Sequence, residues 1–344
     1  MYCKIRNILA IALLCVLMAA CGSTAAEQRT PVSTTSTPAS TPTVASRPST
    51  PQTYPTYVAG SDVCPKSLSF LTSCQTPQSM RTAYGLAPLT TKGFTGKGQT
   101  IIDIVSFGSP TLQQDLDAFD RQFGLPNITV QQISPLKVPT SDPNNDRSGW
   151  AVETTLDVEI IHALAPEANI VVLTSPVAET EGTLGLPEFR QLLQYAIDHK
   201  LGNIVSNSWG ASEITLKDAA GQAELQKWDA LLKQATTENG MTILSSSGDN
   251  GSTDYEDLNA TRLSPTPTTS FATDDPWVTS VGGTSLIRNG SAFSERVWNS
   301  NSSAGGGGFS QFFATPDYQK TLPASVQSML KNRRGVPDVS GNAD

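Results

Sequence analysis

The chain has 344 residues, of which 38% are hydrophobic and 16% are charged, and its formal net charge is −8 with a sequence pI near 4.9. A chain of this length supports one large domain or two small ones. The charged fraction lies below the roughly 25% of an average globular protein, which excludes a coiled coil, and the negative charge excludes a basic protein that is attracted to nucleic acid.

The N-terminus has the pattern of an export signal. Lys4 and Arg6 precede an uncharged apolar run that ends at Ala20 and is too short for a resident transmembrane helix. We therefore predict a signal peptide over residues 1–20. The sequence LMAAC at residues 17–21 resembles a bacterial lipobox, in which the cysteine is acylated. We expect Cys21 to anchor the exported protein at the outer face of the cell membrane; the alternative is ordinary secretion with an incidental Cys21.

A polar linker separates this leader from the folded part of the chain. Residues 21–57 are dominated by Ser, Thr, Pro and Ala, a composition that predicts a solvated, disordered tether. Residues 58–344 then form the domain, which begins with Cys64 and Cys74, ten residues apart. Because exported proteins meet an oxidising environment, we predict a disulfide between these two cysteines.

From Gln99 onward, short β-branched runs alternate with longer helical patterns. The sequence predicts strands at residues 100–105, 128–130, 169–173, 204–206 and 242–244, and helices near residues 112–123, 151–164, 187–199 and 217–237. The strands are nearly continuous apolar runs, as in a parallel sheet with helices on both faces. We therefore predict an α/β fold of this kind, in which functional groups gather at the carboxyl ends of the strands.

The predicted helix at residues 151–164 carries Glu153 and Asp157 one turn apart, so both side chains project from one face. Most such pairs are simply a solvated acidic surface. This helix is apolar on nearly every side, however, so we expect at least one of the two carboxylates to be poorly solvated. Two close carboxylates out of water share a proton, and the raised pKa of such a pair suits general-base chemistry in acid.

Two more candidate segments end predicted strands. Asp249 follows a Ser-Ser-Gly step, where it is either a turn residue or a protonated acid that donates a hydrogen bond to an oxyanion. Ser208, Trp209 and Gly210 end the preceding strand, where a glycine leaves backbone groups available to an extended peptide. The alternative for Trp209 is a place in the core.

The two histidines do not look catalytic. A Ser/His/Asp hydrolase needs a histidine positioned on its serine. His162 lies in an apolar stretch without a glycine-rich context, and His199 lies at a helix end, where the helix dipole explains it.

Five segments occur in the order seen in sedolisins, the serine-carboxyl peptidases, which this chain resembles from about Tyr84 to Asp344. They are Glu153-x-x-x-Asp157-x-Glu159, Ser206-Asn207-Ser208-Trp209-Gly210, Ser246-Ser247-Gly248-Asp249, Val281-Gly282-Gly283-Thr284 and Pro337-Asp338-Val339-Ser340-x-x-Ala343-Asp344. The resemblance implies a subtilisin-like α/β fold and a serine-type endopeptidase that acts in acid.

The resemblance also assigns roles to the candidate residues. It implies that Glu153 is the general base, that Asp157 orients it, and that Asp249 is the oxyanion-hole acid. Ser208, Trp209 and Gly210 would line the substrate strand.

The family's nucleophilic serine lies in a Gly-Thr-Ser-x-x-x-Pro segment, downstream of the match to residues 337–344, and this segment does not occur in the 344 residues. Gly283-Thr284-Ser285 is the one Gly-Thr-Ser, but Asn289-Gly290 follows it as a hairpin signal, so we do not expect Ser285 to be the nucleophile. The family's calcium ligands also lie beyond the match. We therefore expect calcium for the complete family domain but no metal site here. The family's long pro-domain has no counterpart before the match.

We therefore expect the front part of a lipid-anchored, monomeric endopeptidase that acts on proteins or peptides and binds no nucleic acid. As given, the chain is expected to be inactive and marginally folded, because the last part of the sheet would be missing and an edge would stay unpaired. One alternative is a catalytically inactive surface protein that binds peptides on the same scaffold. Another is a different hydrolase that uses Ser285 with a histidine.

Overall fold

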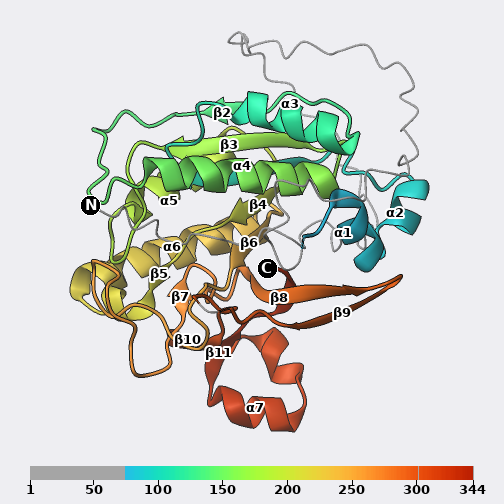
Figure 1. Ribbon diagram of the computed structural model, residues 1–344. Helices are drawn as coiled ribbons and strands as arrows, with labels where there is room; N and C mark the ends of the chain where they lie inside the picture. Colours follow the sequence, from blue (N-terminus) through green and yellow to red (C-terminus); the bar gives the residue numbers. More distant parts are fainter. Residues whose placement is uncertain (1–73, 301, 344) are drawn as a thin grey trace, which may run out of the picture.

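The computed structural model describes residues 74–300 and 302–343, which form an α/β fold around an eight-stranded sheet (Figure 1). The strand order is β12-β8-β6-β4-β1-β3-β2, and every pair along it is parallel. The strands are β1 (Thr100–Ser106), β2 (Gln131–Ile133), β3 (Asn169–Ser175), β4 (Ile204–Asn207), β6 (Thr242–Ser246), β8 (Thr279–Asn289) and β12 (Val339–Asn342). The predicted parallel sheet is thus confirmed.

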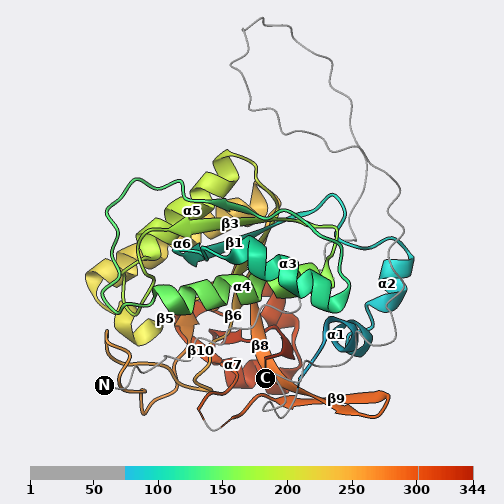
Figure 2. The same cartoon turned by 45° about the horizontal axis from the view of Figure 1, so that its top comes forward.

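Helices cover both faces of this sheet, as Figure 2 shows. On one face α4 (Arg147–Leu164) packs against β1 and β3, with α3 (Leu112–Phe123) beside it. On the other face lie α5 (Leu186–Asp198) and α6 (Ala219–Thr237), which contact each other. Two short helices, α1 (Pro77–Ala83) and α2 (Ala87–Thr91), precede the sheet. This layered arrangement buries the apolar strands from both sides.

The predicted strand at residues 128–130 is wrong. The edge strand β2 begins at Gln131, because the backbone before it bonds to a side chain instead of to β3. The Gln113 amide donates to the Ile128 carbonyl at 3.0 Å, and the Val130 N–H donates to the Gln113 carbonyl oxygen at 3.1 Å. A glutamine side chain on α3 therefore takes the place of a strand partner.

Smaller elements follow the central strands. The strand β8 turns at Asn289-Gly290 into the antiparallel strand β9 (Ala292–Val297), which confirms the predicted hairpin. Two small sheets pair β5 (Ala211–Ser212) with β7 (Ser270–Phe271) and β10 (Gly308–Ala314) with β11 (Arg333–Val336). The helical turns η2 (Glu213–Leu216) and η3 (Asp317–Thr321) and the helix α7 (Ala324–Leu330) complete the fold. The small sheet of β5 and β7 matters most, because it borders the candidate site.

Several predictions concern residues outside the described part. The signal peptide, the lipid site Cys21, the tether and Cys64 all precede residue 74. Cys74 is disulfide-bonded, while its predicted pairing with Cys64 stays a prediction. Between residues 74 and 343, no helix is both long and apolar enough to cross a bilayer.

Candidate active site

Helix α4 holds Glu153 and Asp157 on its sheet-facing side, and neither side chain has any exposed surface. The same side of the helix buries the apolar residues Trp150, Val158 and Ile161, and also Thr154, whose hydroxyl donates to the Trp150 carbonyl at 2.7 Å. The sequence predicted a poorly solvated acidic pair on this helix, and both carboxyl groups are indeed out of water.

Asp157 shares a hydrogen bond with a third carboxyl group, that of Asp103 in the middle of β1. Burial raises the pKa of Asp103 well above its usual value, and the neighbouring Asp157 raises it further. Burial also raises the pKa of Asp157 to about 7, against the opposing effect of hydrogen bonds from Ser208 and Asp103. Because a carboxylate only accepts hydrogen bonds, a hydrogen bond between two carboxyl groups requires that one of them is protonated. The raised pKa values of Asp103 and Asp157 favour such a shared proton on this pair.

Asp103 is not among the predicted site residues, although the sequence carries a signal for it. The strand β1 reads Thr-Ile-Ile-Asp-Ile-Val-Ser, and Asp103 is its one ionisable residue, at the centre of a buried strand. Acidic residues are almost never fully buried unless they are paired. A single aspartate in such a run therefore predicts a buried partner.

Asp249 follows β6, and its burial raises the pKa of the carboxyl group to about 7, with nearby Asp254 adding to the rise. Among the described residues, its Oδ1 atom is buried without a hydrogen-bond partner. The backbone before it is held by a glycine segment: the Gly306 N–H donates to the Gly248 carbonyl at 2.7 Å, and the Ser247 hydroxyl donates to the Gly306 carbonyl at 2.8 Å. Asp249 is thus an acid that stays protonated well above pH 4, with one oxygen free to interact.

A cavity of about 260 Å³ opens at the carboxyl ends of β4 and β6. Ser208, Trp209, Gly210 and Asp249 all line it, so the structure brings four of the predicted site residues to one place. Glu153 and Asp157 lie behind its wall and are not lining residues. Ser208 connects the cavity to the buried carboxyl groups behind it, because its hydroxyl donates to Asp157 Oδ1 at 2.8 Å.

Trp209 belongs to the core as well as to the cavity wall. It is 5% exposed, and its ring packs among Phe189, Trp228 and Phe271. Its indole N–H donates to Asn207 Oδ1 at 3.1 Å. The alternative place of Trp209 in the core is thus confirmed, while its contact with a bound peptide stays a prediction. The next residue, Gly210, leads directly into β5, whose partner is β7.

The remaining candidates lie elsewhere. Ser285 is inside β8, opposite Arg296 of β9, and not at a helix start. Its hydroxyl has no hydrogen-bond partner in the described part of the chain, so neither histidine activates it. His162 is buried beside Asp120, 3.1 Å away, and the Pro126 carbonyl, while His199 stacks on Tyr195. These contacts explain both histidines as structural residues.

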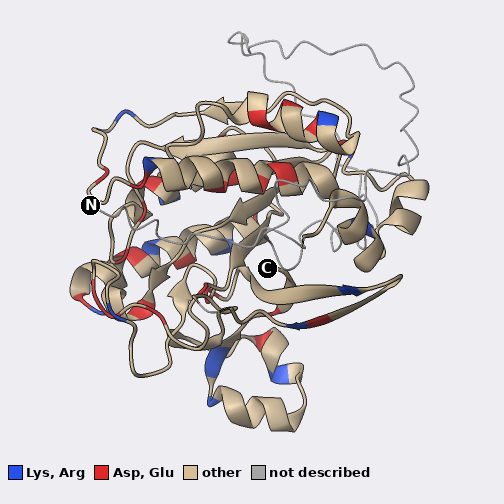
Figure 3. Cartoon of the chain, viewed as in Figure 1, with Lys and Arg blue, Asp and Glu red and all other residues tan. Residues whose placement is uncertain are grey.

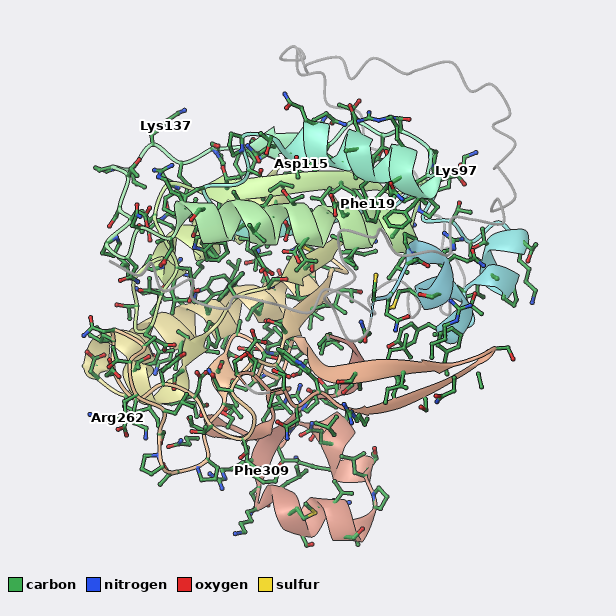
Figure 4. All side chains as sticks on the ribbon, in the orientation of Figure 1. Lys97, Asp115, Phe119, Lys137, Arg262 and Phe309 are labelled. Atoms are coloured by element: carbon green, nitrogen blue, oxygen red, sulfur yellow. The ribbon has the colours of Figure 1, made fainter. Side chains whose placement is uncertain are left out.

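Glu159 does not join the site. It lies in a shallow depression between α3 and α4, where burial and the nearby Asp115 and Asp120 raise its pKa to about 7. Figure 3 shows acidic residues along both helices, and Figure 4 labels Asp115 on α3.

Among residues 74–300 and 302–343, nowhere do three or more His, Cys, Asp or Glu side chains gather so that they could hold a metal ion. No chemical step is assigned to the calcium ion that the resemblance implies.

The sequence is similar to those of several known proteins. No family model matches the sequence. Kumamolisin from Bacillus sp. (strain MN-32) is 31% identical over 287 residues, which cover 81% of this chain and 48% of kumamolisin. Tripeptidyl-peptidase 1 from Mus musculus is 29% identical over 226 residues, which cover 66% of this chain and 36% of that protein. The chain spans less than half the length of these curated relatives.

The fold is also similar to that of a solved structure. The structure of Pseudomonas sedolisin, a serine-carboxyl proteinase, complexed with two molecules of pseudo-iodotyrostatin, superimposes with a TM-score of 0.57 at 25% identity. The match covers 77% of this chain and 70% of that one. The mostly parallel sheet with helices on both faces is therefore the subtilisin-like α/β arrangement that the sequence predicted.

Proposed function

Because this chain belongs to the sedolisin family of serine-carboxyl peptidases, we propose that it carries the acidic part of a serine-type endopeptidase site that hydrolyses peptide bonds of proteins in acid. The proposal rests on one observation: hydrogen bonds connect the wall of the cavity to the carboxyl groups buried behind it. Ser208 lines the cavity and donates to Asp157, which shares a proton with Asp103, while Asp249 lines the same cavity.

Each carboxyl group has a proposed role. Glu153 takes the proton of the attacking hydroxyl and later returns it to the leaving amine, and Asp157 orients and supports Glu153. Asp249, protonated below pH of about 7, donates a hydrogen bond to the oxyanion of the tetrahedral intermediate. A buried carboxylic acid that stays neutral is suited to this task.

The attacking serine is the part that these 344 residues do not provide. Gly-Thr-Ser-x-x-x-Pro does not occur in the sequence, and Ser285 is a strand residue. We propose that the 344 residues alone bind peptides without hydrolysing them. The same observation favours a second candidate, a catalytically inactive surface protein that binds peptides on this scaffold.

Substrates are proposed to be proteins or peptides, bound in extended form along Ser208, Trp209 and Gly210. This position suits a strand-like ligand because β5 and β7 form a short sheet directly beside it. The protein is further proposed to be a monomer, exported and lipid-anchored through Cys21. Calcium binding, which the family shows in general, is proposed to involve none of the described residues.

The proposal is tested by hydrolysis of an unfolded protein between about pH 3 and pH 8. The assay compares the 344 residues with a product extended by any in-frame coding sequence after Asp344. An extended product with a Gly-Thr-Ser-x-x-x-Pro segment should be active in acid, and Glu153→Ala should abolish this activity, while Glu188→Ala on α5 should not. An optimum near pH 8, or full activity of Glu153→Ala, would contradict the proposal.

A further inference from the structure

A second pair of carboxyl groups is buried away from the proposed catalytic residues. Glu213 begins η2, directly after β5, and Asp274 lies in the turn that follows β7. Neither side chain has any exposed surface, and the two carboxyl groups are hydrogen-bonded to each other. A carboxylate only accepts hydrogen bonds, so this contact requires a proton on one of the two groups. The proposed function uses neither residue.

The donors around the pair favour the proton on Asp274 and the negative charge on Glu213. The Glu213 carboxylate accepts hydrogen bonds from the Ser310 hydroxyl and from two successive backbone N–H groups, those of Gln311 at 2.7 Å and Phe312 at 3.3 Å. Such bonds stabilise the ionised form of the group that accepts them. Asp274 Oδ1 has no donor in the described part of the chain, so this oxygen can carry the proton.

Glu213 thereby joins two segments next to the cavity. Its backbone N–H donates to the Thr269 carbonyl at 3.0 Å, beside the paired strands β5 and β7. Its side chain holds β10, which begins two residues after Gly306. The Gly306 N–H donates in turn to the Gly248 carbonyl, directly before Asp249. A displacement of β10 would therefore move the backbone that carries Asp249.

The charged groups around Asp274 are mostly acidic. Burial raises the pKa of Asp274 well above its usual value, its hydrogen-bonded partner raises it further, and the adjacent Asp275 adds to the rise. Asp275 itself faces Asp229 of α6 and Arg334 of β11. Arg334 is the one cation among these groups, and its guanidinium already pairs with Asp338. Loss of the Asp274 proton would therefore place two negative charges together without a free cation among these neighbours.

We propose that Glu213 is a positioning residue for Asp249 and for the bound peptide, and that it acts only while Asp274 carries a proton. In acid, neutral Asp274 and the donors of β10 hold the Glu213 carboxylate, and β10 keeps the backbone of Asp249 in place. When Asp274 loses its proton in alkaline solution, repulsion between the two buried carboxylates separates η2 from β10 and loosens that backbone. The inference rests on the proposed function, because it concerns the geometry of the same site.

Hydrogen exchange measured by mass spectrometry tests this coupling in the 344-residue chain. After correction for the intrinsic effect of pH on exchange, the amides of residues 247–251 and 304–313 should lose about tenfold of their protection between about pH 6 and about pH 9. Asp274→Asn stays neutral and can donate from its amide, so it should keep this protection at about pH 9. Asp198→Asn, an exposed carboxylate at the end of α5, is the matched control and should lose it as the wild type does. An equal loss in Asp274→Asn would overturn the inference.

Glu213→Gln removes the charged acceptor of the β10 donors, so the same amides should be poorly protected at about pH 5 as well. Binding of a short, fluorescent, N-acetylated peptide of alanine and valine at this pH should be about tenfold weaker. Glu238→Gln, exposed at the end of α6, is the matched control. Full binding by Glu213→Gln would contradict its positioning role, and the exchange of Asp274→Asn decides the inference even where Glu213→Gln does not fold. Absence of binding by the wild type would contradict the proposed function instead.

Discussion

Asp249 combines a proposed catalytic use with a cost to folding, because both come from its burial. Its pKa is about 7 in the folded protein and 3.8 in the unfolded chain. Between these values the unfolded chain releases a proton that the folded protein keeps, so the contribution of Asp249 to stability decreases as the pH rises. Above pH of about 7 the folded protein must hold a poorly solvated carboxylate.

We therefore predict that Asp249→Asn raises the free energy of unfolding at about pH 8 by up to ~4 kcal/mol and changes it little at about pH 4. Chemical denaturation at the two pH values measures this difference. Asp198→Asn, at an exposed position at the end of α5, is the matched control. A variant that is equally destabilised at both values would mean that Asp249 is not held in a state that disfavours its charge.

The Asp103 side chain is predicted to act as a neutral donor to Asp157. An asparagine at this position can still donate from its amide, so Asp103→Asn should retain stability at about pH 4. Asp103→Ala leaves a buried hydrogen-bonding group without its partner and should cost ~1–3 kcal/mol. Urea unfolding of both variants provides the comparison. Equal losses would show that the hydrogen bond to Asp157 contributes nothing.

Sequence patterns identify site residues that follow strands better than site residues that lie inside strands. Ser208 and Asp249 come within a few residues of the ends of predicted strands, and parallel strands bring such residues to one edge. Asp103 was not predicted as a site residue because β1, apart from this one aspartate, is an almost continuous apolar run. The hydrogen bond between Asp103 and Asp157 joins residues far apart in the chain, and no local pattern encodes it.

Among the elements, the segment before β10 fixes the position of Asp249. Gly306 lies so close to the end of β6 that an added Cβ would meet the Ser247 carbonyl oxygen at 2.0 Å and the Gly248 carbonyl oxygen at 2.8 Å. These are backbone atoms, which cannot turn aside as a flexible side chain can. The close approach therefore requires glycine at position 306.

We predict that Gly306→Ala displaces the Ser247-Gly248 backbone, abolishes peptide binding and destabilises the fold by ~1–3 kcal/mol or more. Gly290→Ala is the matched control, because an added Cβ there meets nothing within 4 Å and only the positive φ of +65° is strained. This control should cost ~1–2 kcal/mol and keep peptide binding. Thermal melts and the peptide-binding assay measure both effects, and unchanged binding by Gly306→Ala would contradict the role given to this segment.

The long elements were predictable, and the short ones were not. Apolar periodicity located α3, α5 and α6 to within about two residues, but it placed the start of α4 four residues late, because the first turn, Arg147–Trp150, is mostly polar. The strands β5, β7 and β10 show no clear alternation. A side chain from a distant part of the sequence helps to hold β10: Glu213, directly after β5, accepts hydrogen bonds from the Ser310 hydroxyl at 2.5 Å and the Gln311 N–H at 2.7 Å.

The folded part of the chain buries more acidic side chains than the proposed catalytic mechanism uses. Asp274 is fully buried and hydrogen-bonded to Glu213, and burial together with Glu213 raises the pKa of Asp274 well above its usual value. Burial also raises the pKa of its neighbour Asp275 to about 8. With Asp103, Asp157 and Asp249, these residues form a set of acids whose protonated forms are favoured by folding.

The sign of the resulting pH dependence follows from linkage. For each of these acids the pKa is higher in the folded protein than the value of 3.8 in the unfolded chain. Their stabilising contribution is thus fully present below pH of about 4 and decreases as the pH rises toward 8. Exposed Asp257 and Asp317 have lowered pKa values and act in the opposite direction, but only at lower pH.

We therefore predict that the midpoint of thermal unfolding is highest near about pH 4 and falls by ~10 °C or more by about pH 8, since a loss of 1 kcal/mol lowers the midpoint of a domain of this size by ~2–4 °C. Calorimetry at constant ionic strength measures the shift. Asp275→Asn should reduce it by raising the midpoint at about pH 8 alone, because the amide stays neutral where the carboxyl group loses its proton. A midpoint that rises from pH 4 to pH 8 would show that ion pairs such as Arg334–Asp338, and not the buried acids, dominate the stability of this fold.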